Sequence, residues 1–236
     1  MRFSRNLLAL AVLATLALSA STFAGTITGT VKFEGTLPKL PTLKMNADPG
    51  CAKKHSSPVM SELLVVGDGN TMANIFVRVT EVSGSHKAPG EPSVMDQKGC
   101  QYSPHVMGVM VGQEFLIKNS DGLLHNVHSL PKINQGFNRA MPAAVTEASY
   151  TFDKEELMFK IKCDVHPWMN AYVGVMTHPF YDVTGKDGKF EIKGLPAGSY
   201  DVEIWHEKLG TKTASVTVGD SDSKTLDFSM SAPKRK

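Results

Sequence analysis

Three residue types that bind soft metals fall within one seven-residue stretch, CDVHPWM, which runs from Cys163 to Met169. The spacing is Cys-x-x-His-x-x-Met, so a thiolate, an imidazole and a thioether follow one another at steps of three residues. Strand-like alternation precedes Cys163 and resumes at Ala171, while Pro167 forces a turn between the two runs. The pattern therefore predicts that Cys163, His166 and Met169 lie on or beside one loop that directs them to a single point.

A further candidate ligand lies upstream, in the stretch LLHNVHS. His125 and His128 are three residues apart, so on a strand they point to opposite faces and one of them can readily face an interior pocket. Adding this histidine to the loop gives two imidazoles, a thiolate and a thioether, the donor set of a blue-copper site. The alternative is chance packing, in which Cys163 is a buried thiol of a β protein without a metal.

These two stretches resemble the cupredoxins over roughly residues 105–178, and the short ligand loop is most similar to that of the amicyanins. The resemblance implies one type 1 copper ion. It also implies that the ligands are His125, Cys163 and His166 with Met169 as the axial thioether, and that His128 points outward.

The same resemblance implies roles for three neighbours of the ligands. Asn126 is expected to tie the two ligand segments together without binding the metal. Pro167 and Trp168 are expected to form an apolar docking patch around the imidazole edge of His166, through which an electron enters and leaves. Leu124 and Trp168 depart from the family pattern, and Trp168 puts the openness of that edge in doubt.

The N-terminus has the features of a secretory signal peptide over residues 1–24. Arg2 and Arg5 precede the apolar run Leu7 to Leu18, which is short for a membrane span, and small residues follow up to Ala24. We therefore expect a periplasmic or secreted protein with no membrane span in the mature chain. Without the two arginines the formal net charge falls from +2 to 0, which argues against nucleic-acid binding.

The exported part contains three cysteines, an odd number in a compartment that favours disulfides. The simplest assignment joins Cys51 to Cys100 and leaves Cys163 for metal binding. A second metal site made of both cysteines with His55 and His105 is the alternative, although the spacing lacks the Cys-x-x-Cys of zinc sites.

Short runs with strand-like alternation, separated by Gly, Pro, Asn and Asp, predict an all-β fold of Greek-key type. Residues 39–61 and 83–105, which are rich in proline, are expected to be loops. The expected strands cover 27–33, 74–79, 107–118, 149–153, 157–163, 171–177, 188–192, 199–206 and 213–218.

Residues 183–210 resemble the carboxypeptidase regulatory-like domain, a small prealbumin-like β sandwich, in the segments DG, LPAG and YDV. The strands expected first in such a domain, near residues 28–31 and 74–80, precede the copper region. We therefore expect a cupredoxin inserted into this sandwich, with one continuous composite sandwich as the alternative; His206 is expected to be structural. The predicted divisions are 1–24 (signal peptide), 25–97 and 179–232 (regulatory-like sandwich), 98–178 (cupredoxin-like domain) and 233–236 (basic tail).

The chain contains none of the common catalytic motifs, neither Gly-x-Ser-x-Gly nor a phosphate loop nor a Cys-x-x-Cys-His haem attachment. No catalytic residue is predicted. The leading interpretation is an electron carrier with a transient redox protein as its partner. The alternatives are a copper-handling protein without redox turnover and an adhesion or carbohydrate-associated β module without a metal.

Overall fold

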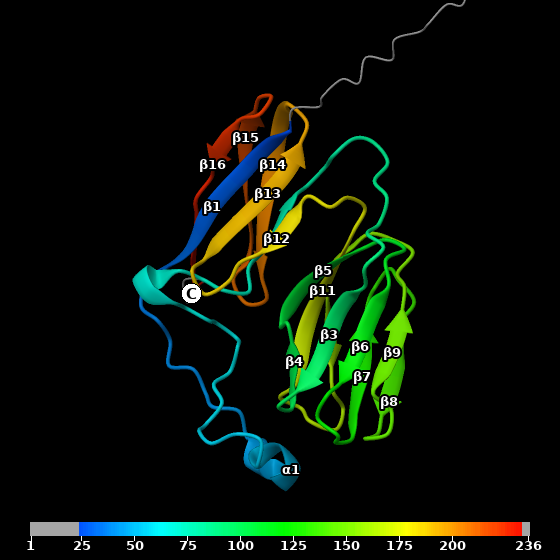
Figure 1. Ribbon diagram of the computed structural model, residues 1–236. Helices are drawn as coiled ribbons and strands as arrows, with labels where there is room; N and C mark the ends of the chain where they lie inside the picture. Colours follow the sequence, from blue (N-terminus) through cyan, green and yellow to red (C-terminus); the bar gives the residue numbers. More distant parts are fainter. Residues whose placement is uncertain (1–23, 233–236) are drawn as a thin grey trace, which may run out of the picture.

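The computed structural model of the protein describes residues 24–232. The predicted signal peptide, apart from Ala24, and the predicted basic tail lie outside the described residues. The predicted all-β fold is confirmed, because the described residues form seventeen strands and only three short helical turns (Figure 1). Within this range no helix is long and apolar enough to cross a membrane.

The strands are distributed over the whole described chain. They are β1 (Gly25–Glu34), β2 (Phe76–Val79), β3 (Ser93–Lys98), β4 (Gln101–Ser103), β5 (Val106–Met110), β6 (Phe115–Asn119), β7 (His125–Leu130), β8 (Asn138–Met141), β9 (Glu147–Tyr150), β10 (Glu156–Lys162), β11 (Asn170–Met176), β12 (Tyr181–Val183), β13 (Lys189–Leu195), β14 (Gly198–His206), β15 (Gly210–Val218), β16 (Ser223–Thr225) and β17 (Phe228–Ser231). The helical turns are η1 (Met45–Ala47), α1 (Pro49–Ala52) and η2 (Asp68–Asn70).

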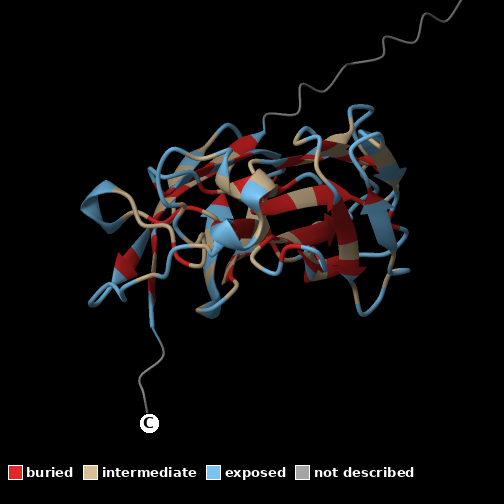
Figure 2. Cartoon of the chain, turned by 90° about the horizontal axis from the view of Figure 1, so that it is seen from below, coloured by how far each residue is buried: buried red, intermediate tan, exposed pale blue. Residues whose placement is uncertain are grey.

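Strands β3 to β11 form two facing sheets, which we call the site sandwich. Their orders are β4-β3-β6-β9 and β5-β11-β10-β7-β8. Alternation decides which side chains face inward: in β6, Phe115, Ile117 and Asn119 are buried while the residues between them are half-exposed. Phe115, Phe152 and Phe159 pack ring to ring in the core between the sheets. Figure 2 shows the buried residues following the strands, with exposed residues on the loops.

The remaining strands form a second pair of sheets, which we call the terminal sandwich. Its sheets are β13-β1-β16, with β17 also paired to β1, and β12-β2-β14-β15. Strands β1 and β2, which precede the site sandwich in sequence, thus share sheets with strands that follow it. Gly29 on β1 permits this packing, because a Cβ there would lie 2.0 Å from the carbonyl oxygen of Leu226.

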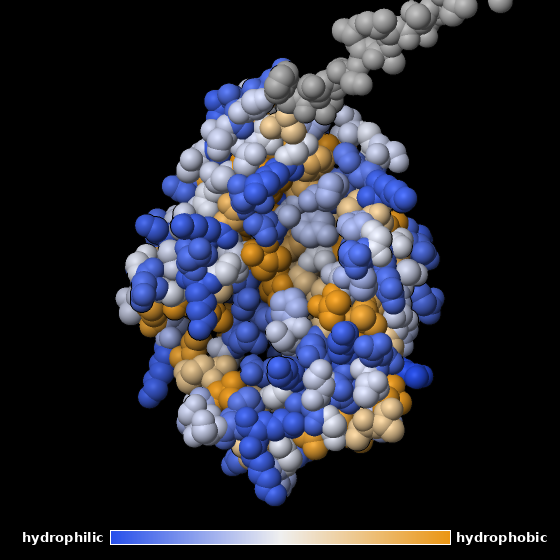
Figure 3. Space-filling view, in the orientation of Figure 1, coloured by the Kyte–Doolittle hydropathy of each residue, from blue (hydrophilic) through white to orange (hydrophobic). Residues whose placement is uncertain are grey.

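The two sandwiches meet at an apolar contact. Phe76 and Tyr181 of the terminal sandwich stack with ring centroids 5.5 Å apart, and Phe76 packs with Val106 and Met158 of the site sandwich. Gly108 on β5 leaves room for the Tyr181 ring, since a Cβ there would lie 2.2 Å from it. On the face shown in Figure 3, apolar residues are visible near the centre, among largely polar surroundings. The contact fixes one sandwich against the other.

The prediction that residues 83–105 form a loop is wrong in part, because this range contains strands β3 and β4. The prolines flank these strands instead of interrupting them: Pro92 precedes β3 and Pro104 follows β4. A tight turn at Gly99 and Cys100, both with positive φ (63° and 52°), joins the two strands. The predicted run 107–118 likewise divides into β5 and β6, separated by a turn with Gly112 at φ 75°.

Residues 35–75 connect β1 to β2 by a long excursion that runs beside the site sandwich and, at α1, below it in the view of Figure 1. This excursion contains α1, which begins with Pro49 at its first position after the N-cap residue Asp48. The side chain of Asp48 accepts the backbone N–H groups of Gly50 and Cys51. A disulfide between Cys51 and Cys100 joins α1 to the β3–β4 turn, as predicted.

The structure supplies a structural role for His206, whose side chain is buried at the end of β14. Its Nδ1 atom accepts the backbone N–H groups of Lys208 and Leu209, at 3.2 and 3.3 Å. Burial lowers the pKa of His206 to about 4, against the opposing effect of the Glu207 charge. The unfolded chain therefore binds a proton near pH 6.5 that the folded protein does not, so stability is lost as the pH falls from about 6.5 towards about 4.

Replacing His206 with asparagine tests this role, because the amide oxygen can accept the same N–H groups and does not titrate. Between pH 7 and pH 5, the wild-type free energy of unfolding should fall by about 2 kcal/mol more than that of His206→Asn. Urea unfolding at both pH values measures the difference. Equal losses in the two proteins would contradict a buried neutral imidazole.

Candidate metal centre

The loop between β10 and β11 is closed by its own backbone. Cys163 donates its backbone N–H to the carbonyl of Met169 (3.1 Å), and Met169 donates to the carbonyl of His166 (2.9 Å). The backbone N–H of His166 in turn points to Cys163 Sγ at 3.3 Å. Cys163 and His166 are both 2% exposed. The short loop thus holds thiol and imidazole side by side in the interior.

Strand β7 supplies the third side chain, and alternation decides which histidine it is. His125, the first residue of β7, is fully buried, whereas His128 faces outward and pairs with Asp164 at 2.9 Å. The structure brings His125, and not His128, to Cys163 and His166. The part of His125 as a copper ligand stays a prediction that rests on this placement.

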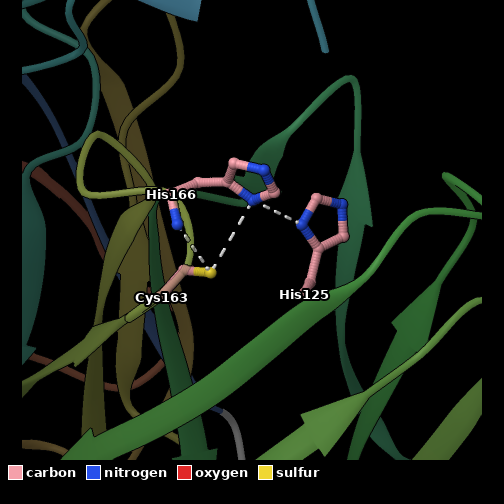
Figure 4. A group of neighbouring side chains, drawn as sticks. All are labelled: His125, Cys163 and His166. Atoms are coloured by element: carbon pink, nitrogen blue, oxygen red, sulfur yellow. Dashed lines mark hydrogen bonds between the residues drawn. The ribbon is translucent and has the colours of Figure 1, made fainter. Parts of the chain in front are cut away.

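The three side chains converge as Figure 4 shows. The Nδ1 atoms of His125 and His166 are 2.9 Å apart, and Cys163 Sγ lies 3.9 Å from His166 Nδ1. One ligand atom from each residue lies within 4.8 Å of the other two. The cluster has the soft sulfur and the two imidazole nitrogens that suit copper, so the residues fit a type 1 site.

Carboxylates hold the far side of each imidazole. His125 Nε2 lies 2.9 Å from Asp121 Oδ2, and His166 Nε2 lies 3.0 Å from Asp48 Oδ2. A carboxylate accepts a proton-bearing nitrogen, so Nε2 of each ring is an N–H. The 2.9 Å contact between the two Nδ1 atoms requires a proton on one of them, which a bound metal would displace. Both rings are therefore oriented so that Nδ1 is the nitrogen that faces the cluster and could bind a metal.

The same contacts shift the acidities of the cluster. Burial opposes the protonated form of His125, but hydrogen bonds to Asp121 and Cys163 outweigh it and raise the pKa of His125 to about 9. Burial likewise opposes the thiolate of Cys163, yet hydrogen bonds, led by that from His125, lower its pKa to about 7. For Asp121, hydrogen bonds from His125 and the backbone outweigh burial and lower the pKa to about 2. The thiolate, the form of cysteine that binds metals, is thus accessible near neutral pH.

Asn126 connects the two segments that carry the candidate ligands. Its Oδ1 accepts the backbone N–H of Asp164 (2.6 Å) and the thiol of Cys163 (3.4 Å). Its amide nitrogen donates to Asn138 Oδ1 (2.7 Å) and to Asp164 Oδ2 (3.2 Å). These contacts tie β7 to the ligand loop, and the role of Asn126 beside a bound metal stays a prediction.

Met169 is buried beside the other loop residues, at 1% exposure. Together with Trp168 and Tyr102 it lines a cavity of about 210 Å³ that also touches Glu62 and Glu207. The backbone of Met169 closes the loop, as described above. Its function as the axial thioether stays a prediction.

The imidazole edge of His166 is not exposed, contrary to the sequence-based prediction. Segment α1 and the disulfide cover it, and Cys51 Sγ lies 3.5 Å from its Nε2 atom. Pro167 is exposed, but Trp168 is half-buried and donates its indole N–H to a backbone carbonyl of the β3–β4 turn at 3.1 Å. A docking role for Pro167 and Trp168 therefore stays a prediction, and direct contact of a partner with His166 is excluded in this conformation.

The alternative second metal site on Cys51 and Cys100 is also not formed, since these two residues are joined in the disulfide. His55 Nε2 bonds to the carbonyl of Gly99 at 2.8 Å. His105 Nε2 bonds to Glu207 at 2.7 Å, in the contact between the two sandwiches. The two histidines thus have separate structural partners.

Sequence reasoning missed Asp48 and Asp121. The signal for Asp48 is local, because Asp-Pro-Gly-Cys places an N-cap residue before Pro49 and next to a disulfide cysteine. Asp121 precedes His125 by four residues, in a turn. Neither position reveals that its carboxylate meets an imidazole, because that contact depends on how α1 and the β6–β7 turn fold over the ligand loop.

The interior cluster of two imidazole nitrogens and one thiol in an all-β sandwich has the donor atoms that a soft metal ion such as copper prefers. In a comparison with known families, residues 167–231 match the carboxypeptidase regulatory-like domain. The matched range includes all strands from β11 to β17, so the predicted resemblance to this family is confirmed.

The similar solved structures include cupredoxins, as the resemblance of the two ligand stretches implies. The Cu(I) form of an amicyanin variant is 23% identical over 42% of this chain and 98% of its own, with a TM-score of 0.33. A purple cupredoxin from Nitrosopumilus maritimus is 22% identical over 36% of this chain and 99% of its own (TM-score 0.31). A copper-containing nitrite reductase from Thermus scotoductus is 18% identical over 42% of this chain and 25% of its own (TM-score 0.34). The comparison with curated proteins finds no match.

The placement of the two β7 histidines predicts different effects of removing them. His125→Ala removes one of the converging Nδ1 atoms and should weaken Cu(II) binding strongly, whereas His128→Ala should leave it within a few-fold of wild type. Competition with a chelator of known affinity measures both. Loss of binding only in His128→Ala would show that the wrong face of β7 had been assigned.

Proposed function

We propose that the protein is an exported type 1 copper protein that carries single electrons between redox partners. The observation that supports this most directly is the convergence of His125 Nδ1, His166 Nδ1 and Cys163 Sγ in the interior of the site sandwich. The proposal follows from donor chemistry and burial in this chain.

In such a site some residues would bind the copper ion and others would hold the binding residues in place. A copper ion held by the two imidazoles, the thiolate and Met169 would supply one-electron chemistry between Cu(II) and Cu(I). The loop and Asn126 keep the donor atoms in place, and Asp48 and Asp121 orient both rings. Since the donors are buried and hydrogen-bonded, little rearrangement accompanies a change of one charge.

The proposal includes no catalytic step. Around the described cluster, each imidazole is bonded through both nitrogens, and burial excludes solvent from the three donor atoms. We therefore propose a carrier that meets a redox protein transiently, in the periplasm or outside the cell.

A second candidate is a copper-binding protein that stores or transfers the ion without redox turnover. The cover over His166 favours it, because a buried ligand edge hinders rapid exchange with a partner. Cyclic voltammetry separates the two functions: a reversible one-electron wave supports the carrier, and an irreversible or absent wave in copper-loaded protein supports the second candidate.

Adding Cu(II) to the chelator-treated protein, with the Cys51–Cys100 disulfide intact and Cys163 as a free thiol, should produce an intense visible absorption band, because a thiolate bound to Cu(II) gives sulfur-to-copper charge transfer. The Cys163→Ser variant should stay colourless, since the other two cysteines are joined in the disulfide. Titration followed by absorption spectroscopy measures both proteins. A colourless wild-type complex would overturn the type 1 assignment.

Replacing Met169 with leucine should retain the colour but raise the reduction potential. A distant thioether donates weakly to Cu(II), and an apolar side chain in its place favours Cu(I). Voltammetry of the copper-loaded variant measures the shift. An unchanged potential would indicate that Met169 is only a packing residue.

A further inference from the structure

The first observation concerns Asp48, which uses its two carboxylate oxygens for different tasks. Oδ1 accepts the backbone N–H groups of Gly50 and Cys51, at 2.7 and 3.3 Å, and so begins α1. Oδ2 lies 3.0 Å from Nε2 of His166. Asp48 thus attaches the covering segment directly to a candidate copper ligand.

Asp121 makes a matching set of contacts on the other histidine. Its oxygens accept the backbone N–H groups of Gly99 and Cys100, both at 2.7 Å, and Oδ2 lies 2.9 Å from His125 Nε2. Lys54, which follows α1, pairs with Asp121 Oδ1 at 3.2 Å. Each imidazole is therefore hydrogen-bonded to a carboxylate that also accepts the backbone N–H of a disulfide cysteine.

The disulfide joins these two sets of contacts, because Asp48 accepts the backbone N–H of Cys51 and Asp121 accepts that of Cys100. The result is a closed chain of contacts that runs from His166 through α1 and the disulfide to His125. The sulfur of Cys51 also contacts the His166 ring at 3.5 Å. Moving the cover would therefore disturb the orientation of both rings.

We infer that Asp48 is a positioning residue of the copper centre, supplied by the segment between β1 and β2, and that the Cys51–Cys100 disulfide holds it in place. The inference rests on the proposed copper function and extends it to residues outside the ligand loop. A carboxylate on Nε2–H makes the imidazole a stronger donor, which stabilises Cu(II) relative to Cu(I) and lowers the reduction potential.

Two substitutions separate the helix-capping task of Asp48 from its contact with His166. Asp48→Ser retains a capping oxygen but is too short to reach the ring. Asp48→Asn retains the size but is neutral, so its amide either turns its nitrogen to the ring and loses the contact with His166 or keeps that contact as a weaker, uncharged hydrogen bond. Asp222→Asn is the matched control: Asp222 also accepts a backbone N–H in a turn (Gly219, 3.0 Å), but on the terminal sandwich.

The experiment measures copper affinity and reduction potential of these variants in the full mature chain. Asp48→Ser should bind Cu(II) 10–100-fold more weakly, the typical loss for a residue that supports a ligand, and its potential should rise. Asp48→Asn should raise the potential as well, and Asp222→Asn should match wild type. A reversible wave with an unchanged potential in both Asp48 variants would overturn the inference and leave the proposed function intact; absence of copper binding in the wild type would overturn both.

A second readout does not need copper. In apo-protein labelled with ¹⁵N-histidine, the Nε2–H proton of His166 should exchange slowly with water, because it is buried and bonded to Asp48. In Asp48→Ser it should exchange quickly, and in Asp222→Asn slowly. Fast exchange in the wild type would contradict the hydrogen bond itself.

The role of the disulfide is tested by a double-mutant cycle. In a Cys51→Ala/Cys100→Ala background the cover is no longer anchored, so Asp48→Ser should change the potential much less than in the wild type. Equal changes in both backgrounds would show that Asp48 acts without the disulfide. If the disulfide-free background does not fold, comparison of the His166 Nε2–H exchange rate before and after addition of a dithiol reductant to the apo-protein gives the same test, with faster exchange expected and no change as the contrary result.

Discussion

Each imidazole of the candidate centre has two nitrogens, and both must be satisfied away from water. This requirement organises the surrounding structure, because a buried polar atom without a partner is costly. Asp121 and Asp48 satisfy Nε2 of His125 and His166, which turns both Nδ1 atoms toward Cys163. The direction of the donor atoms is thus fixed by contacts on the opposite side of the rings.

Elements farther from the two imidazoles hold this arrangement in place. The site sandwich supplies the paired strands β7 and β10, and Asn126 ties β7 to the ligand loop that follows β10. The excursion from the terminal sandwich brings Asp48, and the disulfide secures it. Contacts such as Tyr181 over Gly108 hold the two sandwiches against each other. The terminal sandwich and the segment between β1 and β2 thus complete a candidate metal centre that the site sandwich alone would leave open.

Local sequence patterns made the fold class and part of the candidate metal centre predictable. The three-residue steps from Cys163 to Met169 and the alternation around His125 depend only on nearby backbone geometry, and so does the all-β class. The strands β3 and β4 were missed because Pro92 and Pro104 flank them closely. The cover over His166 was missed because it joins residues more than a hundred positions apart, and spacing alone does not show which surface Asp48 meets.

Copper-edge X-ray absorption of the Cu(II)-loaded protein tests the central claim most directly, because it reports the atoms bound to the metal. The account predicts one short copper–sulfur distance from Cys163 and two copper–nitrogen distances from the imidazoles of His125 and His166. A spectrum with only nitrogen and oxygen neighbours would contradict it, since the thiolate would then lie outside the metal centre.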